Sequence, residues 1–171
     1  KVSFTGSVPV GKQLAALAAQ HMKRSTMELG GHSPVIVFDD AEVERAADLL
    51  QAFKFRNAGQ VCVSPTRFYL HEKIYDRFMA RFLDKTRAMK VGSGLEEGTR
   101  MGPLANTRRL PAMQSFVEDA NARGGRIELG GERLSDKGNF FAPTIVTELP
   151  DDSLLMTAEP FGPIAPFVRF K

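Results

Sequence analysis

The feature that most constrains the fold of this chain is an uninterrupted apolar run, Pro34-Val35-Ile36-Val37-Phe38, which lies between segments with helical periodicity. A strand without polar alternation is typical of a parallel sheet that is covered on both faces. Strand-like segments recur along the chain, and stretches with apolar residues at helical spacing separate most of them. This alternation predicts an α/β fold with a mostly parallel sheet and flanking helices.

The individual elements follow from local patterns. Strands are expected at residues 2–4, 25–29, 34–38, 67–70, 127–129, 141–146 and 164–170. Helices are expected at residues 11–22, from a cap at Asp39-Asp40 to about residue 57, from residue 72 to just before Gly92, and from a cap at Asn106 or Thr107 to Gly124. Gly30-Gly31 separates the opening strand, helix and strand from the rest, which predicts two domains, 1–31 and 32–171. We also expect the strands at 141–146 and 164–170 to expose a sheet edge.

Composition excludes several classes of protein. The 23 basic and 20 acidic residues give a formal net charge of +3, and no basic run is interleaved with aromatic residues, so no nucleic-acid partner is expected. No apolar stretch reaches the roughly 18 residues of a membrane span and no signal peptide leads the chain, which predicts a cytoplasmic protein. One cysteine excludes an internal disulfide, and the 3 histidines lack metal-ligand spacing, so no metal site is expected. Because the chain begins and ends in strand-like residues, we expect it to be a piece of a longer polypeptide.

Cys62 is the first candidate for chemistry. It follows Asn57-Ala58-Gly59, where a helix is expected to break, and Gly59 permits a tight turn that presents a side chain and free backbone N–H groups to one point. A thiolate nucleophile needs such exposure, together with N–H groups that hold a developing oxyanion. The alternative is a buried small apolar residue, which is the commonest role of a lone cysteine.

Three further segments hold candidate residues. Glu28 ends a strand beside Gly30-Gly31, and apolar neighbours that desolvate it would raise its pKa and make it a better base, although a solvated carboxylate is the simpler interpretation. Thr5-Gly6-Ser7 links a strand to a helix, where N–H groups can hold a phosphate, but a plain turn explains it equally well. Glu159 lies in a loop restrained by two prolines, which either holds its carboxylate toward a ligand or simply leads into a strand.

Together these segments resemble the aldehyde dehydrogenase superfamily. The motifs Phe4-Thr5-Gly6-Ser7, Met27-Glu28-Leu29-Gly30-Gly31, Gly59-Gln60-Val61-Cys62 and Glu159-Pro160-Phe161-Gly162-Pro163 occur in the family's order and with similar spacing. The resemblance covers essentially the whole chain and reaches only the middle of a family member. It implies that residues 32–171 are the family's catalytic domain, truncated at its C-terminal end. Residues 1–31 would be the C-terminal remnant of the cofactor-binding domain, the last strand, helix and strand of a Rossmann-type fold.

The resemblance also implies a role for each motif. Cys62 would be the nucleophile that forms a thiohemiacetal and then a thioester, and Glu28 would activate the water that hydrolyses this thioester. The cofactor, NAD or NADP, would be held by Gly6, Ser7, Leu29, Gly30, Glu159 and Phe161. The substrate would be a small aldehyde, and residues 53–67 and 138–143 look most like bacterial succinate-semialdehyde and α-ketoglutarate-semialdehyde dehydrogenases, whose aldehydes carry a remote carboxylate. Family members are usually homodimers or homotetramers.

Some positions depart from the family's pattern, and alternatives stay open. Ser64 stands where small residues or Cys are common, and Ala158 replaces an acid that often precedes Glu159. The family's second oxyanion donor and the residues that hold the adenosine ribose belong to a segment upstream of Lys1, which leaves NAD and NADP both open. The isolated fragment is therefore expected to be inactive. The alternative is a non-catalytic folded remnant or a thiol esterase, and a cysteine hydrolase is a further alternative that needs a Cys–His pair.

Overall fold

The computed structural model describes residues 1–171, which divide into two compact units, Lys1–Gly31 and His32–Lys171. The division falls directly after the Gly30-Gly31 pair. The identity of the units as a cofactor domain and a catalytic domain stays a prediction, and each unit is described by itself.

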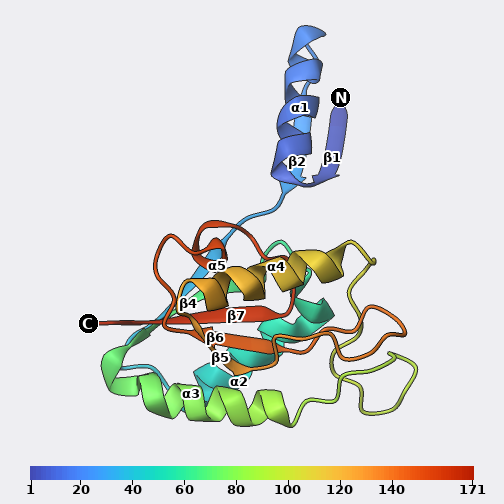
Figure 1. Ribbon diagram of the computed structural model, residues 1–171. Coiled ribbons are helices and arrows are strands. Elements are labelled where there is room, and N and C mark those ends of the chain that lie inside the picture. Colours follow the sequence, from blue (N-terminus) through green and yellow to red (C-terminus); the bar gives the residue numbers. More distant parts are fainter. The chain divides into compact units, whose positions relative to one another are not determined.

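The first unit is a strand–helix–strand motif of β1 (Val2–Gly6), α1 (Val8–Gln20) and β2 (Ser25–Leu29) (Figure 1). The two strands are parallel neighbours, with Gly6 opposite Leu29. α1 packs closely on β2, because a Cβ placed on Gly11 would lie 2.5 Å from the Leu29 side chain. Glycine at this position therefore lets the helix and the strand approach.

The second unit is built on a five-stranded sheet with the order β3-β4-β7-β6-β5. The bounds of its strands are Ser33–Val37 for β3, Pro65–His71 for β4, Arg126–Leu129 for β5, Thr144–Thr147 for β6 and Ile164–Phe170 for β7. All neighbouring strands run parallel except β5 and β6, which are antiparallel. The predicted α/β fold with a mostly parallel sheet is confirmed.

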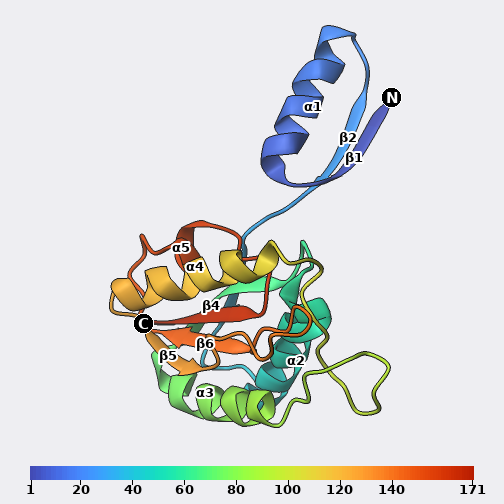
Figure 2. The ribbon, with the colours of Figure 1, turned by 45° about the vertical axis from the view of Figure 1, so that its right-hand side comes forward.

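Helices cover both faces of this sheet (Figures 1 and 2). α2 (Val43–Phe55) and α3 (Glu72–Arg87) lie on one face, and α4 (Arg109–Ala122) and the short α5 (Leu154–Thr157) lie on the other. A 3-10 turn, η1 (Arg56–Gly59), follows α2. The continuous apolar run at residues 34–38 lies in and directly after the edge strand β3, where Val37 is buried but Ile36 and Phe38 are each 57% exposed. The prediction that this run is covered on both faces is therefore wrong, because an edge strand lacks a neighbour on one side.

The core on the α2 and α3 side is aromatic. Phe68 of β4 stacks on Phe167 of β7 with ring centroids 4.6 Å apart, and Phe82 of α3 meets both rings at 5.7 and 5.0 Å. Each such pair contributes roughly 0.5–1.5 kcal/mol beyond its buried area. These contacts fix α3 against the two central strands, and Phe55 of α2 adds a further contact with Phe82 at 6.1 Å.

Several sequence predictions about elements are wrong in detail. β7 is central and β6 lies inside the sheet, so the exposed edges are β3 and β5 rather than the predicted strands. Asp39-Asp40 does not cap α2, which begins at Val43, because the Asp39 carboxylate instead accepts a bond from Lys73 of α3 at 2.8 Å. Phe141 forms only an isolated bridge with Arg133 ahead of β6, and α5 was not predicted.

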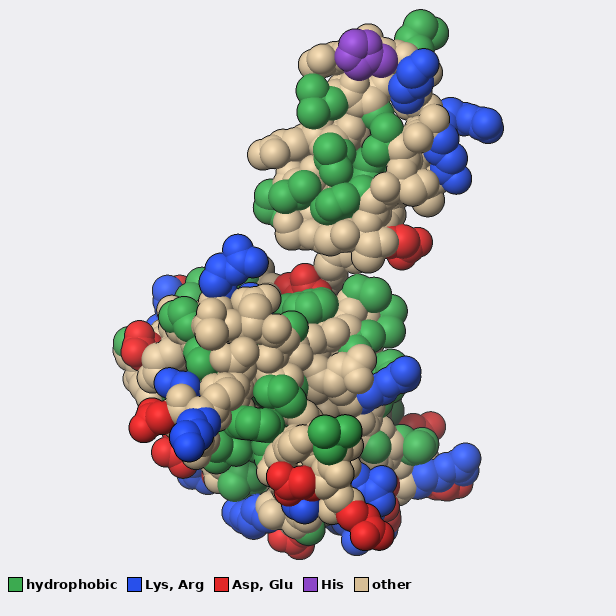
Figure 3. All heavy atoms as spheres, turned by 90° about the vertical axis from the view of Figure 1, so that its right-hand side faces the viewer, with side chains coloured by type: hydrophobic (Ala, Val, Ile, Leu, Met, Phe, Trp, Pro, Cys, Tyr) green, Lys and Arg blue, Asp and Glu red, His purple; other side chains and the backbone are tan.

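The surface carries charges of both signs. On the face drawn in Figure 3, basic and acidic side chains are mixed over the second unit. Several of them form exposed ion pairs between α2 and α3, such as Arg81 with Asp48 at 2.7 Å. No helix of the structure has both the length and the apolar character that a membrane crossing requires.

Candidate active site

The segment between α2 and β4 carries Cys62 on a strained turn. Asn57, Ala58 and Gly59 have φ values of 51°, 54° and 70°, so three consecutive residues lie in the left-handed region. A left-handed conformation costs a non-glycine residue about 1–2 kcal/mol. Such strain persists only where surrounding contacts enforce it, and it is concentrated at functional sites.

Cys62 occupies the tip of the next turn. The Ser64 N–H donates to the Val61 carbonyl at 2.9 Å, which places Cys62 at the second position of a four-residue turn. The Cys62 thiol is exposed, and its backbone N–H has no acceptor within the protein. The turn therefore presents a thiol and a free N–H group together, the arrangement that a nucleophile with an oxyanion donor needs.

The segment of residues 57–64, called the nucleophile turn below, packs through Gly59 against the loop that carries Glu159. A Cβ on Gly59 would overlap the carbonyl oxygen of Gly162, and a Cβ on Gly162 would overlap the sulfur of Met113 in α4. The turn and the Glu159 loop therefore meet backbone to backbone, and the Met113 side chain of α4 packs directly against the loop. The segments that carry Cys62 and Glu159 are thus neighbours within the second unit. Their order in the sequence did not reveal this contact.

Arg109 of α4 fixes the Glu159 loop through its backbone. Its Nη2 donates to the Pro160 carbonyl at 2.5 Å and to the Phe161 carbonyl at 3.2 Å. Phe161 itself has a positive φ of 41°, so the loop is held in a conformation that its sequence does not favour. The Glu159 carboxylate is half-buried and accepts no hydrogen bond from the protein, which leaves its oxygens available to a ligand.

Lys54, in the last turn of α2, is fully buried beneath the nucleophile turn, with 0% exposure. Its carbonyl accepts a bond from the hydroxyl of Ser64 at 3.4 Å, but its Nζ has no partner. Burial lowers the pKa of Lys54 to about 7, and the charge of Glu159 opposes this shift. Sequence reasoning missed both Lys54 and Arg109, because nothing local distinguishes a buried lysine from the many exposed ones.

The histidines do not form a catalytic pair with the thiol. His32 Nδ1 lies 2.7 Å from the Thr66 hydroxyl, and burial lowers the pKa of His32. His71 Nδ1 accepts the N–H of Lys73 at the start of α3. Neither histidine is bonded to Cys62, so the alternative of a cysteine hydrolase has no structural support.

The candidate residues of the first unit lie around the start of α1 and along β2. Ser7 is the N-cap residue of α1, and its hydroxyl makes no capping bond, which leaves it and the first N–H groups of the helix free for an anion. Glu28 is exposed on β2, whereas Leu29 is half-buried against α1. The desolvation expected for Glu28 is not present in this unit, and its role as a base stays a prediction.

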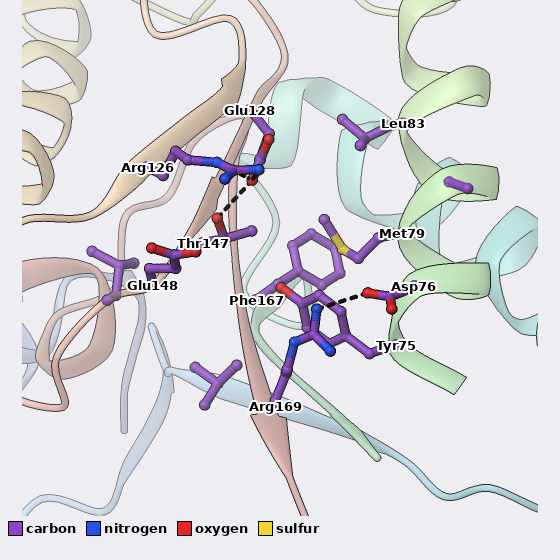
Figure 4. Close-up of a pocket in the computed structure, with 13 residues that line it drawn as sticks. Tyr75, Asp76, Met79, Leu83, Arg126, Glu128, Thr147, Glu148, Phe167 and Arg169 are labelled. Atoms are coloured by element: carbon purple, nitrogen blue, oxygen red, sulfur yellow. Dashed lines mark hydrogen bonds and ion pairs between the residues drawn. The ribbon is translucent and has the colours of Figure 1, made fainter. Parts of the chain in front are cut away.

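A pocket of about 570 Å³ lies elsewhere, between α3 and strands β5–β7 (Figure 4). Most of its charged groups are paired: Arg169 donates to Asp76 at 2.7 Å and stacks over the ring of Tyr75, and Arg126 pairs with Glu128 at 2.7 Å. Glu148 lines the pocket without an ion-pair partner. No cysteine lines it, so this pocket does not contain the chemistry assigned to Cys62.

A second cavity, of about 600 Å³, lies beside the strained turn. Arg56 and Asn57 of the turn line it, together with Lys85 and Arg100. Lys85 is paired with Asp48 at 3.4 Å, whereas Arg56 and Arg100 have no carboxylate partner within ion-pair distance. The side chains that line the cavity therefore carry an excess of positive charge. One of them, Arg56, precedes Cys62 by six residues in the chain.

Comparison with known proteins gives one family. Residues 1–171 match the model of the aldehyde dehydrogenase family. The chain is 47% identical over 170 residues to the putative 4-(hydroxymethyl)benzenesulfonate dehydrogenase TsaD2 of Comamonas testosteroni, which covers 99% of this chain and 35% of the relative. It is 40% identical over 171 residues to GabD, an NADP(+) succinate-semialdehyde dehydrogenase of Escherichia coli strain K12, with coverage of 100% and 36%.

A solved structure agrees with these relatives. The succinate-semialdehyde dehydrogenase of Burkholderia pseudomallei matches with a TM-score of 0.96 and 42% identity, over 99% of this chain and 35% of the other. The chain thus spans about a third of the length of the relatives that it matches.

Proposed function

Because the chain belongs to the aldehyde dehydrogenase family, we propose that the full-length protein oxidises an aldehyde to a carboxylate through a covalent adduct on Cys62. The exposed thiol at the tip of the Val61–Ser64 turn, beside an N–H group without an acceptor, is the observation that carries this proposal. The thiol esterase and the non-catalytic remnant are the alternatives that the experiment below separates from it.

The covalent steps use the geometry of the turn. The Cys62 thiolate attacks the aldehyde carbon, and the carbonyl oxygen takes up the negative charge as a thiohemiacetal. The free N–H of Cys62 stabilises this oxyanion, and removing one such donor typically costs about 10²–10³ in rate. Loss of a hydride from the former aldehyde carbon then leaves a thioester on Cys62.

Hydrolysis of the thioester needs a base. We assign this role to Glu28, whose carboxylate removes a proton from water as the water attacks the thioester carbon. The carboxylic acid leaves, and Cys62 regains its thiol. The support for Glu28 is its place in the Met27–Gly31 motif, which resembles that of the family.

NAD or NADP, when bound, accepts the hydride. The chain's residues fit a dinucleotide in two respects: the start of α1 offers free N–H groups and the Ser7 hydroxyl to a phosphate, and the unbonded Glu159 carboxylate offers acceptors to ribose hydroxyls. We propose that Gly6 and Ser7 lie along the phosphates, and that Leu29, Gly30 and Phe161 lie near the nicotinamide. Assays with NAD⁺ and with NADP⁺ in parallel decide which of the two the protein uses.

The proposal for the substrate class rests on the anionic groups of the compounds for which the relatives are named and on an unpaired arginine of this chain. The two curated relatives are named for compounds that carry a sulfonate or a carboxylate away from the reacting carbon. In this chain Arg56, which has no carboxylate partner, lines a cavity together with Asn57, at the start of the strained segment that leads to Cys62. We propose that the substrate is a semialdehyde with a remote carboxylate, which a guanidinium binds through two parallel hydrogen bonds. The proposed assembly is a homodimer or homotetramer, as in the family.

The test is Cys62→Ala in the full-length protein, with NAD(P)H formation followed at 340 nm over succinate semialdehyde and butanal. We expect the oxidation to disappear while calorimetry shows cofactor affinity close to that of wild type. Val63→Ala, an exposed neighbour on the same turn, is the matched control and should keep its activity. Substantial oxidation by the Cys62→Ala protein would refute the proposal, and ester hydrolysis without any oxidation by wild type would favour the thiol esterase.

A further inference from the structure

Arg109, the first residue of α4, donates its hydrogen bonds to a backbone rather than to an acid. Its Nη2 binds the carbonyls of Pro160 and Phe161, at 2.5 and 3.2 Å, and it forms no ion pair with the adjacent Glu159. The burial of a charged group costs stability unless hydrogen bonds compensate for the lost water. For this half-buried guanidinium the two loop carbonyls are the only acceptors, and its Nε has none.

The loop that carries Glu159 depends on contacts from outside itself. Phe161 has a φ of 41°, in the left-handed region that non-glycine residues rarely adopt. Pro160 and Pro163 have no N–H group, so the loop has few donors with which to fix its own path. A strained conformation persists only where its surroundings enforce it, and Arg109 provides two of the hydrogen bonds that do so.

The start of α4 is a fixed base for this contact. The Ala105 N–H, just ahead of the helix, donates to Oε1 of Gln60 in the nucleophile turn at 2.9 Å. The Arg109 N–H in turn donates to the Asn106 carbonyl at 3.1 Å. Arg109 therefore reaches the Glu159 loop from a backbone that is itself fastened to the nucleophile turn.

The far end of α4 holds a different part of the same segment. Asp119 accepts the N–H of Leu154, the first residue of α5, at 2.7 Å. Arg123 pairs with Asp119 at 2.7 Å and with Asp152 at 2.8 Å. These contacts fasten α5 and not the loop after it, so among the charged residues of α4 only Arg109 binds the loop directly.

We propose that Arg109 is a positioning residue for cofactor binding: it fixes the backbone of Pro160 and Phe161, which keeps the carboxylate of Glu159 free and directed at the ribose of NAD or NADP. This role rests on the proposed function, in which Glu159 binds the ribose. An arginine next to a carboxylate often binds it through two parallel hydrogen bonds. Here such a pair would occupy the oxygens that the ribose needs. Arg109 does not touch the reacting atoms.

A double-mutant cycle on the full-length protein tests this role. Titration calorimetry gives the affinities of NAD⁺ and NADP⁺ for wild type, Arg109→Met, Glu159→Ala and the double variant. We expect Arg109→Met to weaken binding about tenfold and to add little once Glu159 is replaced, because Arg109 acts through Glu159. The kcat at saturating cofactor should stay within about twofold of wild type, since the loss is one of binding.

Two control variants separate this role from charge and from stability. Arg108→Met removes the same charge from an exposed neighbour and should bind cofactor as wild type. Arg123→Met removes the ion pairs at the far end of α4, so it should lower the thermal midpoint without weakening cofactor binding.

Arg109→Lys keeps the proposal testable should Arg109→Met not fold. Its ammonium group can donate to one of the two carbonyls, so its cofactor affinity should lie between those of wild type and Arg109→Met. A merely structural arginine would produce a loss of stability without this order of affinities.

Distinct results contradict the role and the proposed function. Wild-type affinity in Arg109→Met or in Arg109→Lys, an equal loss in Arg108→Met, or losses that add in the double variant would each overturn the role of Arg109. If wild type binds neither NAD⁺ nor NADP⁺, the proposed function fails, and the role of Arg109 falls with it. Binding by wild type together with an uncoupled cycle overturns the role of Arg109 alone.

Discussion

Gly59→Ala is expected to be a strongly damaging small substitution in the second unit. Gly59 has a φ of 70°, and an alanine Cβ there would overlap the carbonyl oxygen of Gly162, far inside the 3.0 Å that Cβ atoms keep from their neighbours. The atom in the way belongs to backbone, so no side-chain rotation relieves the overlap. Either the nucleophile turn or the Glu159 loop has to move.

The magnitude has two parts. The left-handed conformation costs an alanine about 1–2 kcal/mol. Forcing extra volume between two backbone segments adds about 1–3 kcal/mol, so the expected loss is about 2–5 kcal/mol. Two other glycines separate these parts: Gly124 has a φ of 84° but open space around it, and Gly94 has neither the unusual φ nor a close neighbour.

The assay is the apparent thermal midpoint of the three alanine variants of the full-length protein at one scan rate and concentration. Gly94→Ala should leave the midpoint nearly unchanged, and Gly124→Ala should lower it slightly, since it carries only the cost of the left-handed conformation, about 1–2 kcal/mol. Gly59→Ala should lower it most and also slow the alkylation of Cys62. A Gly59→Ala protein as stable as Gly124→Ala would refute the contact between the turn and the loop.

Three further predictions concern the site. Glu28→Gln should give a burst of NAD(P)H followed by a slow steady state, because the thioester still forms but is hydrolysed slowly; equal losses of burst and steady state would mean that Glu28 acts earlier. Arg56→Met should raise the KM for succinate semialdehyde about tenfold or more and leave that for butanal unchanged, and equal effects on both would contradict a carboxylate contact. Lys54→Met should raise the thermal midpoint below pH 7, and this gain should disappear as the pH rises toward 10.5. The reason is that burial lowers the pKa of Lys54 from 10.5 to about 7, so holding the lysine protonated in the folded state costs stability at low pH. A gain in midpoint that grows with pH would contradict this.

Local patterns predicted most of the fold. The apolar run at residues 34–38 and the stripes that follow it indicated a parallel sheet between helices, and β2 and β7 have the predicted bounds. Strand order could not be predicted in the same way. β7, last in the sequence, inserts between β4 and β6, and this pairing depends on the packing of Phe167 against Phe68 rather than on any local signal.

The candidate site divides along similar lines. The helix break at Asn57–Gly59 and the turn at Cys62 are local events, and Gly59 signalled them in the sequence. Lys54 of α2 is buried at the end of its helix, and Arg109 of α4 binds the carbonyls of Pro160 and Phe161, about 50 residues further along the chain. No spacing in the sequence reveals such a contact. The role of Glu28 stays a prediction from its motif.

The most direct measurement is the identification of the covalent adduct. Full-length Glu28→Gln protein is mixed with succinate semialdehyde and NADP⁺ or NAD⁺, quenched in acid during the burst, and digested for mass spectrometry. The proposal predicts that the peptide containing Cys62 carries one acyl group, and that the adduct is absent when cofactor is omitted or Cys62 is alanine. An acyl group on another residue, or product formation in wild type without any adduct on Cys62 in the slow variant, would contradict it.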